Sequence, residues 1–254
     1  MTTSSSKNFE IDVAEYIEEA FERCGLELRT GYDLKTAKRS MNLLFADWAN
    51  RGLNQWTIDQ TSITVASGVS EYPAGTLTLS VGASASFTVG ETITGGTSAA
   101  TASITSKPTT TSVATTIPVG TFSNGETITG GTSAATTTVS AVQDLSDVQS
   151  TIDILSTVVT RDGTDFAIDR LSRSEFLNIP TKTQTGRPNQ FFLDRQITPV
   201  LKIWPVPDNS TDILKFNRLT RIEDADAFTN TVDVPFRFYP CLAAGLAYYL
   251  SMKK

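Results

Sequence analysis

A stretch of twelve residues, GETITGGTSAAT, occurs twice in this chain, at positions 90–101 and 125–136. The copies lie 35 residues apart, and the similarity extends beyond the twelve identical residues, because Phe87 matches Phe122 before them and ATASI at 100–104 matches ATTTV at 135–139 at their ends. A strict duplication of this kind is typical of a structural unit that is used twice. We therefore expect two copies of one fold, near 84–106 and 119–142.

The duplicated copies lie in a segment, 74–146, that is rich in Thr, Ser, Gly and Ala and poor in charge. Thr alternates there with Ile or Val, which predicts strands, and the Gly-Gly pairs suit hairpin turns that need positive φ. We expect a compact β module of two related lobes, with Gly95 and Gly96 in a turn equivalent to that of Gly130 and Gly131. The alternative is a largely flexible Thr/Ser-rich loop.

The sequence outside this segment predicts helices at both ends and strands between them. Residues 9–55 carry two apolar stripes at helical spacing, which favours a helical hairpin, and a third helix begins near Pro235 or Pro240. Alternating β-branched runs start near Trp56, and the pair Asp162–Gly163 indicates a tight hairpin. A serine three residues before a glutamate, in SRSEFLNI, indicates one short capped helix among the strands.

The predicted fold class is α+β. The helical hairpin and the C-terminal helix are expected to form a helical bundle, joined to a β-rich region that carries the inserted two-lobed all-β module. The expected domains are a core of 9–73 and 147–254, and the insert 74–146.

Charges of opposite sign lie on the two helices of the predicted hairpin. The first helix carries Glu18 and Glu22 on its exposed side, and the second begins with Lys35, Lys38 and Arg39. One interpretation is two solvated faces. The other is that these charges meet, either within the hairpin or between neighbouring subunits of an oligomer, so we treat them as candidate interface residues.

Composition excludes several classes of function. The chain has 254 residues, a formal charge of −6, two cysteines and no histidine. An acidic chain is poorly suited to binding phosphate backbones, and two cysteines provide neither a disulfide framework nor a metal cluster. The N-terminus has no apolar signal-peptide core, and the longest apolar run is half of what a membrane span needs.

The sequence gives little sign of catalysis. Without histidine, serine triads and His-containing metal sites are excluded. An acidic cluster of Glu223, Asp224 and Asp226 leaves paired carboxylates possible, but the pattern favours a solvated turn between a strand and the last helix. The Gly-Gly pairs do not match a phosphate-binding loop. We therefore expect no enzyme activity, no catalytic or metal-binding residues and no cofactor.

The order of motifs outside the insert resembles a known family. These motifs are LLFADWANRGLNQWT, DRLSRSEFLNIPTKTQTGRPNQFFLDRQITPVLKIWPVPD and RIEDADAFTNTVDVPFRFYPCLAAGLAYYLSMK. Together they are similar to the head-to-tail adaptor proteins of short-tailed bacteriophages, of the tail tubular protein A type. The resemblance covers the chain except for the insert and the extreme N-terminus. By this resemblance, members of the family continue past the equivalent of SMKK in a longer charged helix, so we expect this chain to be incomplete or to contact the portal differently.

The resemblance implies a structural protein of the virion, at the head-to-tail junction, assembled in the host cytoplasm. Such adaptors, or connectors, form rings of twelve subunits that bind the portal above and the tail nozzle or tail tube below. DNA passes through the channel without specific binding during ejection. Tyr248 and Tyr249 of the last helix would then lie at or near a subunit or portal contact, unless they belong to the intrachain core.

The insert is expected to project from the ring, where it would contact tail fibres or the capsid. Two other functions remain open at this point. One is a β-rich tail component that binds host-surface glycans through the duplicated insert. The other is a cell-wall hydrolase that uses the acidic cluster.

Overall fold

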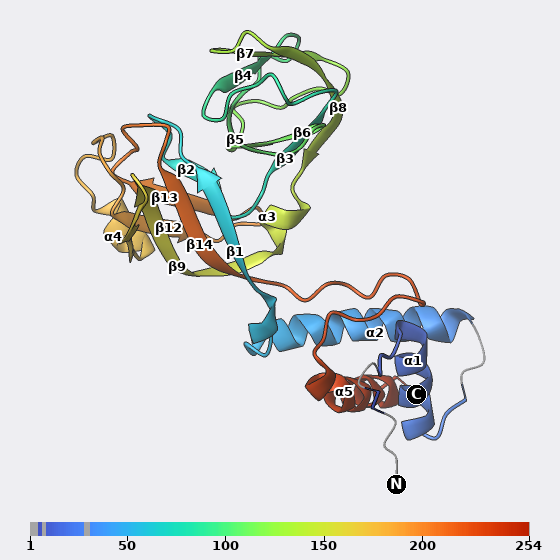
Figure 1. The fold of residues 1–254 in the computed structure, drawn as a ribbon. Coiled ribbons are helices and arrows are strands. Elements are labelled where there is room, and N and C mark those ends of the chain that lie inside the picture. The colour runs from blue at the N-terminus through green and yellow to red at the C-terminus, as the bar shows by residue number, and fades with distance from the viewer. Residues whose placement is uncertain (1–4, 7–8, 28–30, 254) are drawn as a thin grey trace. The chain divides into compact units, whose positions relative to one another are not determined.

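The computed structural model describes residues 5–6, 9–27 and 31–253. Helices and strands are both abundant, which confirms the α+β class (Figure 1). The described residues include no helix that is long and apolar enough to cross a membrane.

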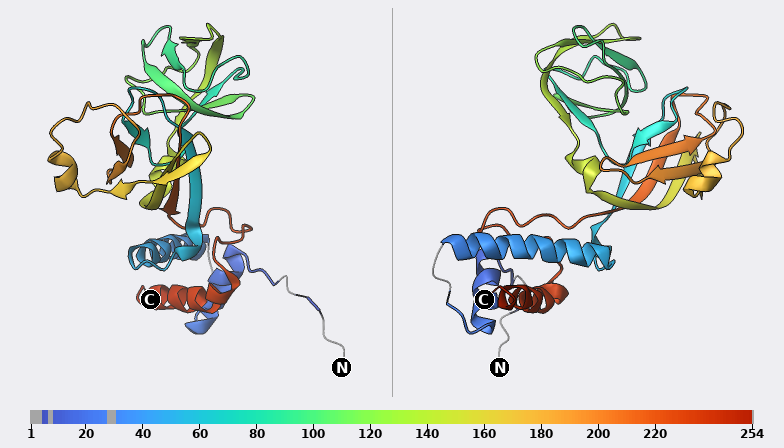
Figure 2. Two further views of the ribbon diagram at one scale, coloured as in Figure 1. Left: turned by 60° about the vertical axis from the view of Figure 1, so that its left-hand side comes forward. Right: turned by 180° about the vertical axis from the view of Figure 1, so that it is seen from behind.

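The chain divides into two compact units, each of which is drawn from two further directions in Figure 2. The helical unit contains Met1–Thr57 and Arg221–Lys254, and the strand unit contains Ile58–Thr220. The predicted core of 9–73 and 147–254 is therefore divided between the two units, and the insert lies in the strand unit with the other strands.

The helical unit is built from three α-helices that share one apolar core. Their apolar stripes supply the fully buried side chains of Ile17, Met41 and Leu246, as the helical spacing predicts. The expected helical bundle stays a prediction beyond this shared core. The helices are α1 (Val13–Arg23), α2 (Gly31–Asn50) and α5 (Tyr239–Ser251), with short 3-10 helices η1 (Gln55–Thr57) and η2 (Phe236–Phe238).

The strand unit contains two four-stranded sheets that share a second core. Their strand orders are β1-β14-β9-β10 and β11-β12-β13-β2. The bounds of the first sheet are β1 (Ile58–Thr64), β14 (Ile213–Thr220), β9 (Thr151–Arg161) and β10 (Thr164–Ala167). Those of the second are β11 (Asp169–Arg170), β12 (Gln190–Asp194), β13 (Val200–Trp204) and β2 (Glu71–Pro73).

Two local sequence signals in this unit are confirmed. Asp162 and Gly163 join β9 to β10, and both have positive φ, at 52° and 77°. That backbone is the one that a two-residue hairpin with the right-handed strand twist requires. Ser172 caps the short helix α4 (Arg173–Leu177) through a capping box with Glu175.

The insert forms one closed barrel of six strands, in the order β3-β6-β5-β4-β7-β8 (Figure 1). Each copy begins earlier than the expected 84–106 and 119–142, since the first supplies three strands from Thr78 onward and the second supplies the equivalent three from Ser112 onward. These strands are β3 (Thr78–Val81), β4 (Thr92–Gly95) and β5 (Thr101–Thr109), followed by β6 (Ser112–Thr115), β7 (Thr127–Gly130) and β8 (Thr136–Asp144).

The prediction of two lobes is therefore wrong. Strands of different copies pair directly, since β4 pairs with β7 and β3 pairs with β6. The β4–β7 register is symmetric about Thr94 and Thr129, which are equivalent positions of the two copies. Each copy has few large apolar residues, and both bury theirs in a single core that includes Ile93 and Ile128. One copy alone would leave this apolar face and two strand edges exposed to water.

The two ends of the barrel meet where the insert leaves the sheets. Thr78 at the start of β3 pairs with Asp144 at the end of β8. The short helix α3 (Ser146–Ser150) then leads into β9. Because the insert begins and ends at neighbouring positions, it interrupts the surrounding fold at one place only.

A buried guanidinium holds this junction together. Arg218 of β14 is 4% exposed, and its Nη2 donates to Asp147 Oδ1 at 2.6 Å and to Asp59 Oδ2 at 3.0 Å. Its Nη1 donates to the Thr151 hydroxyl and to the Asp147 carbonyl. A Cβ on Gly75 would stand 2.5 Å from Nη1, so a larger residue at this position would displace the guanidinium. Arg218 thus ties β14, β1 and α3 together.

We predict that Arg218→Met lowers the free energy of unfolding of the strand unit by about 3 kcal/mol, since the hydrogen bonds to two carboxylates are lost. The matched control is Lys215→Met on the same strand, which removes the exposed ion pair with Asp165 and should cost less than about 1 kcal/mol. Urea unfolding of the three proteins measures both values. Equal losses for the two variants would contradict the role given to Arg218.

Candidate functional site

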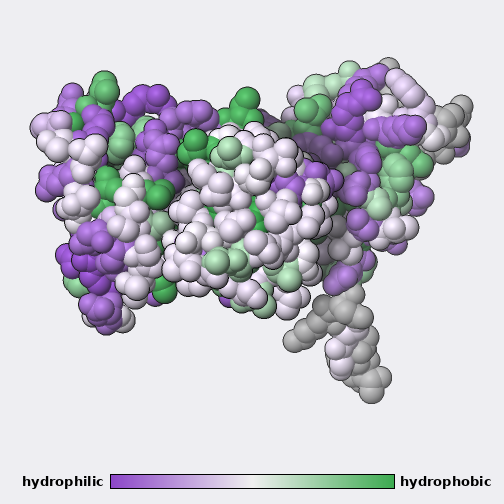
Figure 3. Space-filling model, turned by 90° about the horizontal axis from the view of Figure 1, so that it is seen from above, coloured by the Kyte–Doolittle hydropathy of each residue, from purple (hydrophilic) through white to green (hydrophobic). Residues whose placement is uncertain are grey.

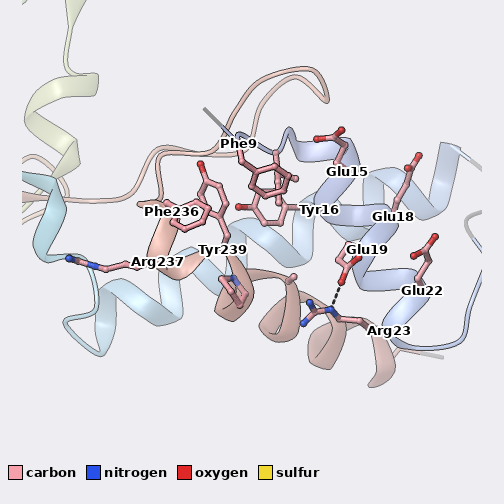
Figure 4. Close-up of a pocket in the computed structure, with 13 residues that line it drawn as sticks. Phe9, Glu15, Tyr16, Glu18, Glu19, Glu22, Arg23, Phe236, Arg237 and Tyr239 are labelled. Atoms are coloured by element: carbon pink, nitrogen blue, oxygen red, sulfur yellow. Dashed lines mark hydrogen bonds and ion pairs between the residues drawn. The ribbon is translucent and has the colours of Figure 1, made fainter. Parts of the chain in front are cut away.

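A groove of about 700 Å³ lies in the helical unit, between α1, the segment before it, and the residues around η2 (Figure 4). It differs from the rest of this unit in combining exposed aromatic rings with a row of carboxylates. The groove is lined by Phe9, Ile11, Glu15, Tyr16, Glu18, Glu19, Glu22, Arg23, Phe236, Arg237, Tyr239, Pro240 and Ala243.

The start of α1 is fixed by local hydrogen bonds. Asp12 Oδ1 accepts from the Glu15 amide at 2.8 Å, and Glu15 Oε2 accepts from the Asp12 amide at 3.1 Å, which completes a capping box. The Val13 amide donates to the Asn230 carbonyl at 3.0 Å. These bonds set the helix so that its apolar stripe faces the core and its carboxylates face solvent.

Four aromatic rings form the floor of the groove. The ring of Tyr239 lies 5.4 Å from that of Phe236, 5.7 Å from that of Tyr16 and 6.5 Å from that of Phe9. Phe9 and Phe236 also contact each other edge to face. Both remain open to solvent, with exposed fractions of 64% and 68%. Exposed aromatic rings that are gathered in this way mark interaction sites more often than scattered surface residues do.

The Tyr16 hydroxyl is an unusual feature of this floor. Tyr16 is 1% exposed, and its hydroxyl has no hydrogen-bond partner among the described residues. Burial, followed by the charge of the nearby Tyr239, raises the pKa of Tyr16 above its ordinary value, so the hydroxyl keeps its proton and remains a donor. A buried polar group left without a partner costs about 1–3 kcal/mol.

The carboxylates of α1 form one rim of the groove. Glu19 Oε1 accepts from Arg23 Nε at 2.6 Å, so these two charges neutralise each other (Figure 4). Glu18 and Glu22 form no ion pair within the described part of the chain, and both are exposed. Among the described residues, the rim therefore carries negative charge that no ion pair neutralises.

The candidate interface residues of the sequence fall into separate groups. Glu18 and Glu22 line the groove, whereas Lys35, Lys38 and Arg39 lie on α2 and do not line it. The opposite charges do not meet within the hairpin in the described residues. Lys38 Nζ instead donates to the Asp226 carbonyl at 2.8 Å. Their contact between subunits stays a prediction.

The two tyrosines of α5 differ in environment. Tyr248 is 63% exposed, whereas Tyr249 is half-buried and packs against the core of the helical unit. Their rings contact each other edge to face at 6.2 Å. Of this pair, only Tyr248 offers most of its surface to a partner.

The acidic cluster lies in the segment before η2 and not in the groove. The Asp224 carboxylate pairs with Arg221 at 3.0 Å, and the Ala225 amide donates to Asn42 Oδ1 at 2.8 Å. Glu223 and Asp226 are exposed. The described residues include no group of three or more carboxylates, cysteines or histidines arranged to hold a metal ion.

Sequence reasoning missed the aromatic floor. Phe9 and Phe236 come from opposite ends of the chain, and no periodic pattern links them. The one available signal was the run VPFRFYP at 234–240, in which three aromatic residues stand between prolines and so cannot all follow a helical stripe.

The turn glycines of the insert occupy equivalent positions, as predicted, but for a different reason. Gly95 ends β4 and Gly130 ends β7. Gly95, Gly96, Gly130 and Gly131 do not adopt positive φ. The positive φ in each turn, 55° in both, belongs instead to an alanine, the fourth residue after the glycine that ends the strand.

These glycines are needed for space. A Cβ on Gly95 would stand 2.6 Å from Glu126 Oε2, and one on Gly130 would stand 2.6 Å from Glu91 Oε2. Each carboxylate belongs to the copy opposite the glycine that it approaches. The barrel therefore brings a glutamate of one copy against the turn of the other.

Each glutamate holds the opposite turn by hydrogen bonds. Glu126 accepts from the Ser98 amide at 3.0 Å and from the Ser98 hydroxyl at 2.8 Å. Glu91 accepts from the Ser133 amide at 2.9 Å and from the Ser133 hydroxyl at 2.8 Å. Both carboxylates are buried. The exchange is reciprocal, so neither copy has a complete turn without the other.

No protein-family model matches this chain, and no curated protein sequence matches it.

We predict that the barrel loses stability in acid because of these carboxylates. Burial tends to raise the pKa of Glu126, but hydrogen bonds from Ser98, Ser123 and Thr97 outweigh it and lower the pKa to about 2. A lowered pKa means that the stabilisation is complete above the unfolded value of about 4.3 and is lost as the pH falls toward 2. Urea midpoints at successive pH values, read from the methyl signals of Ile93 and Ile128, measure this loss.

Glu126→Gln is the control for that titration. The variant should be less stable at pH 7 by about 2 kcal/mol, because the amide nitrogen cannot accept the bonds that one carboxylate oxygen accepted. It should also lose less stability than the unsubstituted protein between pH 4 and pH 2. Parallel losses in both proteins would contradict the assignment to Glu126.

Proposed function

We propose that this chain is a structural protein of a virion that forms the ring-shaped head-to-tail adaptor between the portal and the tail. It acts by binding other proteins and lining the DNA exit channel, and not by catalysis. The observation that carries the proposal is the groove of the helical unit, whose exposed rings and unneutralised carboxylates form a surface suited to a protein partner.

The charge of the chain supports this role. A channel wall of net negative charge repels phosphates, so DNA slides past it without being held.

The remaining parts of the proposal come from the resemblance in motif order. Twelve copies assemble into the ring, and α1, α2 and α5 form its helical bundle. The portal binds on one side and the tail nozzle or tail tube on the other, with Tyr248 near a subunit or portal contact. The barrel stands at the periphery, where tail fibres or the capsid are its nearest partners.

Glycan binding by the insert is the competing function, and the described side chains do not favour it. Ligand sites are lined predominantly by apolar and aromatic side chains with a few convergent polar groups. The two aromatic residues of the insert, Phe87 and Phe122, are buried in the barrel core. The face of the barrel that is seen in Figure 3 is mostly pale, with few strongly hydrophilic or strongly hydrophobic residues. The exposed residues of the barrel strands include Thr92, Thr94 and Thr129.

Imaging of the purified protein with the portal protein of the same particle tests the proposal. We predict that negative-stain micrographs show rings, formed by the chain alone or after it is mixed with the portal. In the mixture, these rings should stack on the portal. A chain that stays monomeric and never joins the portal, at concentrations where the portal itself is intact, would contradict the adaptor function.

Removal of the insert tests whether ring formation depends on the barrel. Because Thr78 and Asp144 are paired neighbours, residues 79–143 can be replaced by an Asn-Gly turn without stretching the chain. We predict that this variant still forms rings with the portal, with the unsubstituted protein imaged in parallel as the control. Loss of ring formation in a variant that keeps its sheet signal in circular dichroism would show that the barrel itself is needed for assembly.

A further inference from the structure

We propose that the groove of the helical unit binds a basic amphipathic helix of a partner protein. The inference rests on the proposed function only where it names the partner as a protein of the same particle. The chemistry of the groove is independent of the proposed function. The helix would place apolar side chains on the aromatic floor and Lys or Arg side chains along the α1 rim.

The negative charge of the rim favours an occupant of positive charge. Glu15, Glu18 and Glu22 all line the groove from one helix, and none of them forms an ion pair within the described part of the chain. Of the two lining arginines, Arg23 is already paired with Glu19. Arg237 extends away from the four rings in Figure 4, and its guanidinium lies 5.4 Å from the centre of the Phe238 ring. An acidic segment would meet repulsion along the whole rim.

The spacing of the rim selects a helix. Glu15, Glu18 and Glu22 are three and four residues apart, so their carboxylates project from adjacent turns of one face over about 10 Å. A second helix that runs along the rim repeats at the same pitch, and basic residues at i, i+3 and i+7 would face the three carboxylates. Helices commonly bind in grooves by apolar anchors at such spacing.

The floor supplies the apolar part of the contact. Phe9 and Phe236 are exposed over the groove, so their rings offer area that a leucine or phenylalanine side chain would remove from water.

Binding of model peptides to the whole chain tests the inference. The probe is a fluorescein-labelled, alanine-based helical peptide of 18 residues. Two leucines, four residues apart, lie on one face of this peptide, and three lysines, spaced by three and then four residues, lie on the adjacent face. One control peptide has glutamate in place of lysine, and a second has serine in place of leucine. Fluorescence anisotropy at 50 mM and 300 mM NaCl measures their affinities.

We expect the basic amphipathic peptide to bind more tightly than both controls, and to bind less tightly at the higher salt concentration. The double variant Glu18→Gln, Glu22→Gln should weaken its binding about five- to tenfold at 50 mM NaCl, since two exposed ion pairs are lost. Phe236→Ala should weaken it about tenfold at both salt concentrations. Circular dichroism checks that each variant keeps its helices.

The matched control is the double variant Glu223→Gln, Asp226→Asn, which removes the same charge from exposed positions of the helical unit outside the groove. It should bind the basic peptide as the unsubstituted chain does. Equal weakening by both double variants, equal binding of the acidic peptide, or no binding by the unsubstituted chain would overturn the inference. Self-association of the chain could also block the peptide. If sedimentation shows such self-association and the groove variants abolish it, the groove binds a second copy of this chain, and the inference is overturned.

The result is separate from the ring experiment. A chain that binds the peptide but never forms rings keeps the groove assignment and loses the adaptor function. A chain that forms rings but does not bind the peptide keeps the adaptor function and loses the groove assignment.

Discussion

The buried guanidinium of Arg218 is the interaction on which the arrangement of the strand unit depends. It joins β14 to β1 and to α3, at the place where the barrel rejoins the two sheets. A charge at 4% exposure is stable only when its donors are occupied, and here two carboxylates, a carbonyl and a hydroxyl accept them. Because the insert enters and leaves beside this residue, a barrel of six strands is accommodated without breaking either sheet.

The barrel in turn explains the duplication. Glu91 and Glu126 each complete the turn of the opposite copy, so the identical sequence is used to make two halves that hold each other. This reciprocity accounts for the glycines, which leave room for the carboxylates, and for the scarcity of large apolar residues, because two small faces close into one core. The two copies of the insert thus complete each other's turns and core. The groove with its exposed rings lies elsewhere, in the helical unit.

The sequence predicted features that depend on neighbouring residues and failed on those that depend on distant ones. The Asp162–Gly163 hairpin and the capping box of Ser172 are local, and both are present. The closed barrel depends on pairing between β4 and β7, which no local pattern encodes, so two lobes were expected. Glu18 and Glu22 were identified from their spacing, but the aromatic floor beside them required Phe9 and Phe236 to meet from opposite ends of the chain.

Hydrogen–deuterium exchange tests the central claim that the groove of the helical unit is bound by a partner protein in the assembled junction. Amide exchange would be compared between the isolated chain and the same chain in the assembled junction. The account predicts slower exchange in the junction for α1 and for residues 236–243, with little change in β4 and β7. Slower exchange in the barrel strands, with the groove segments unchanged, would contradict it.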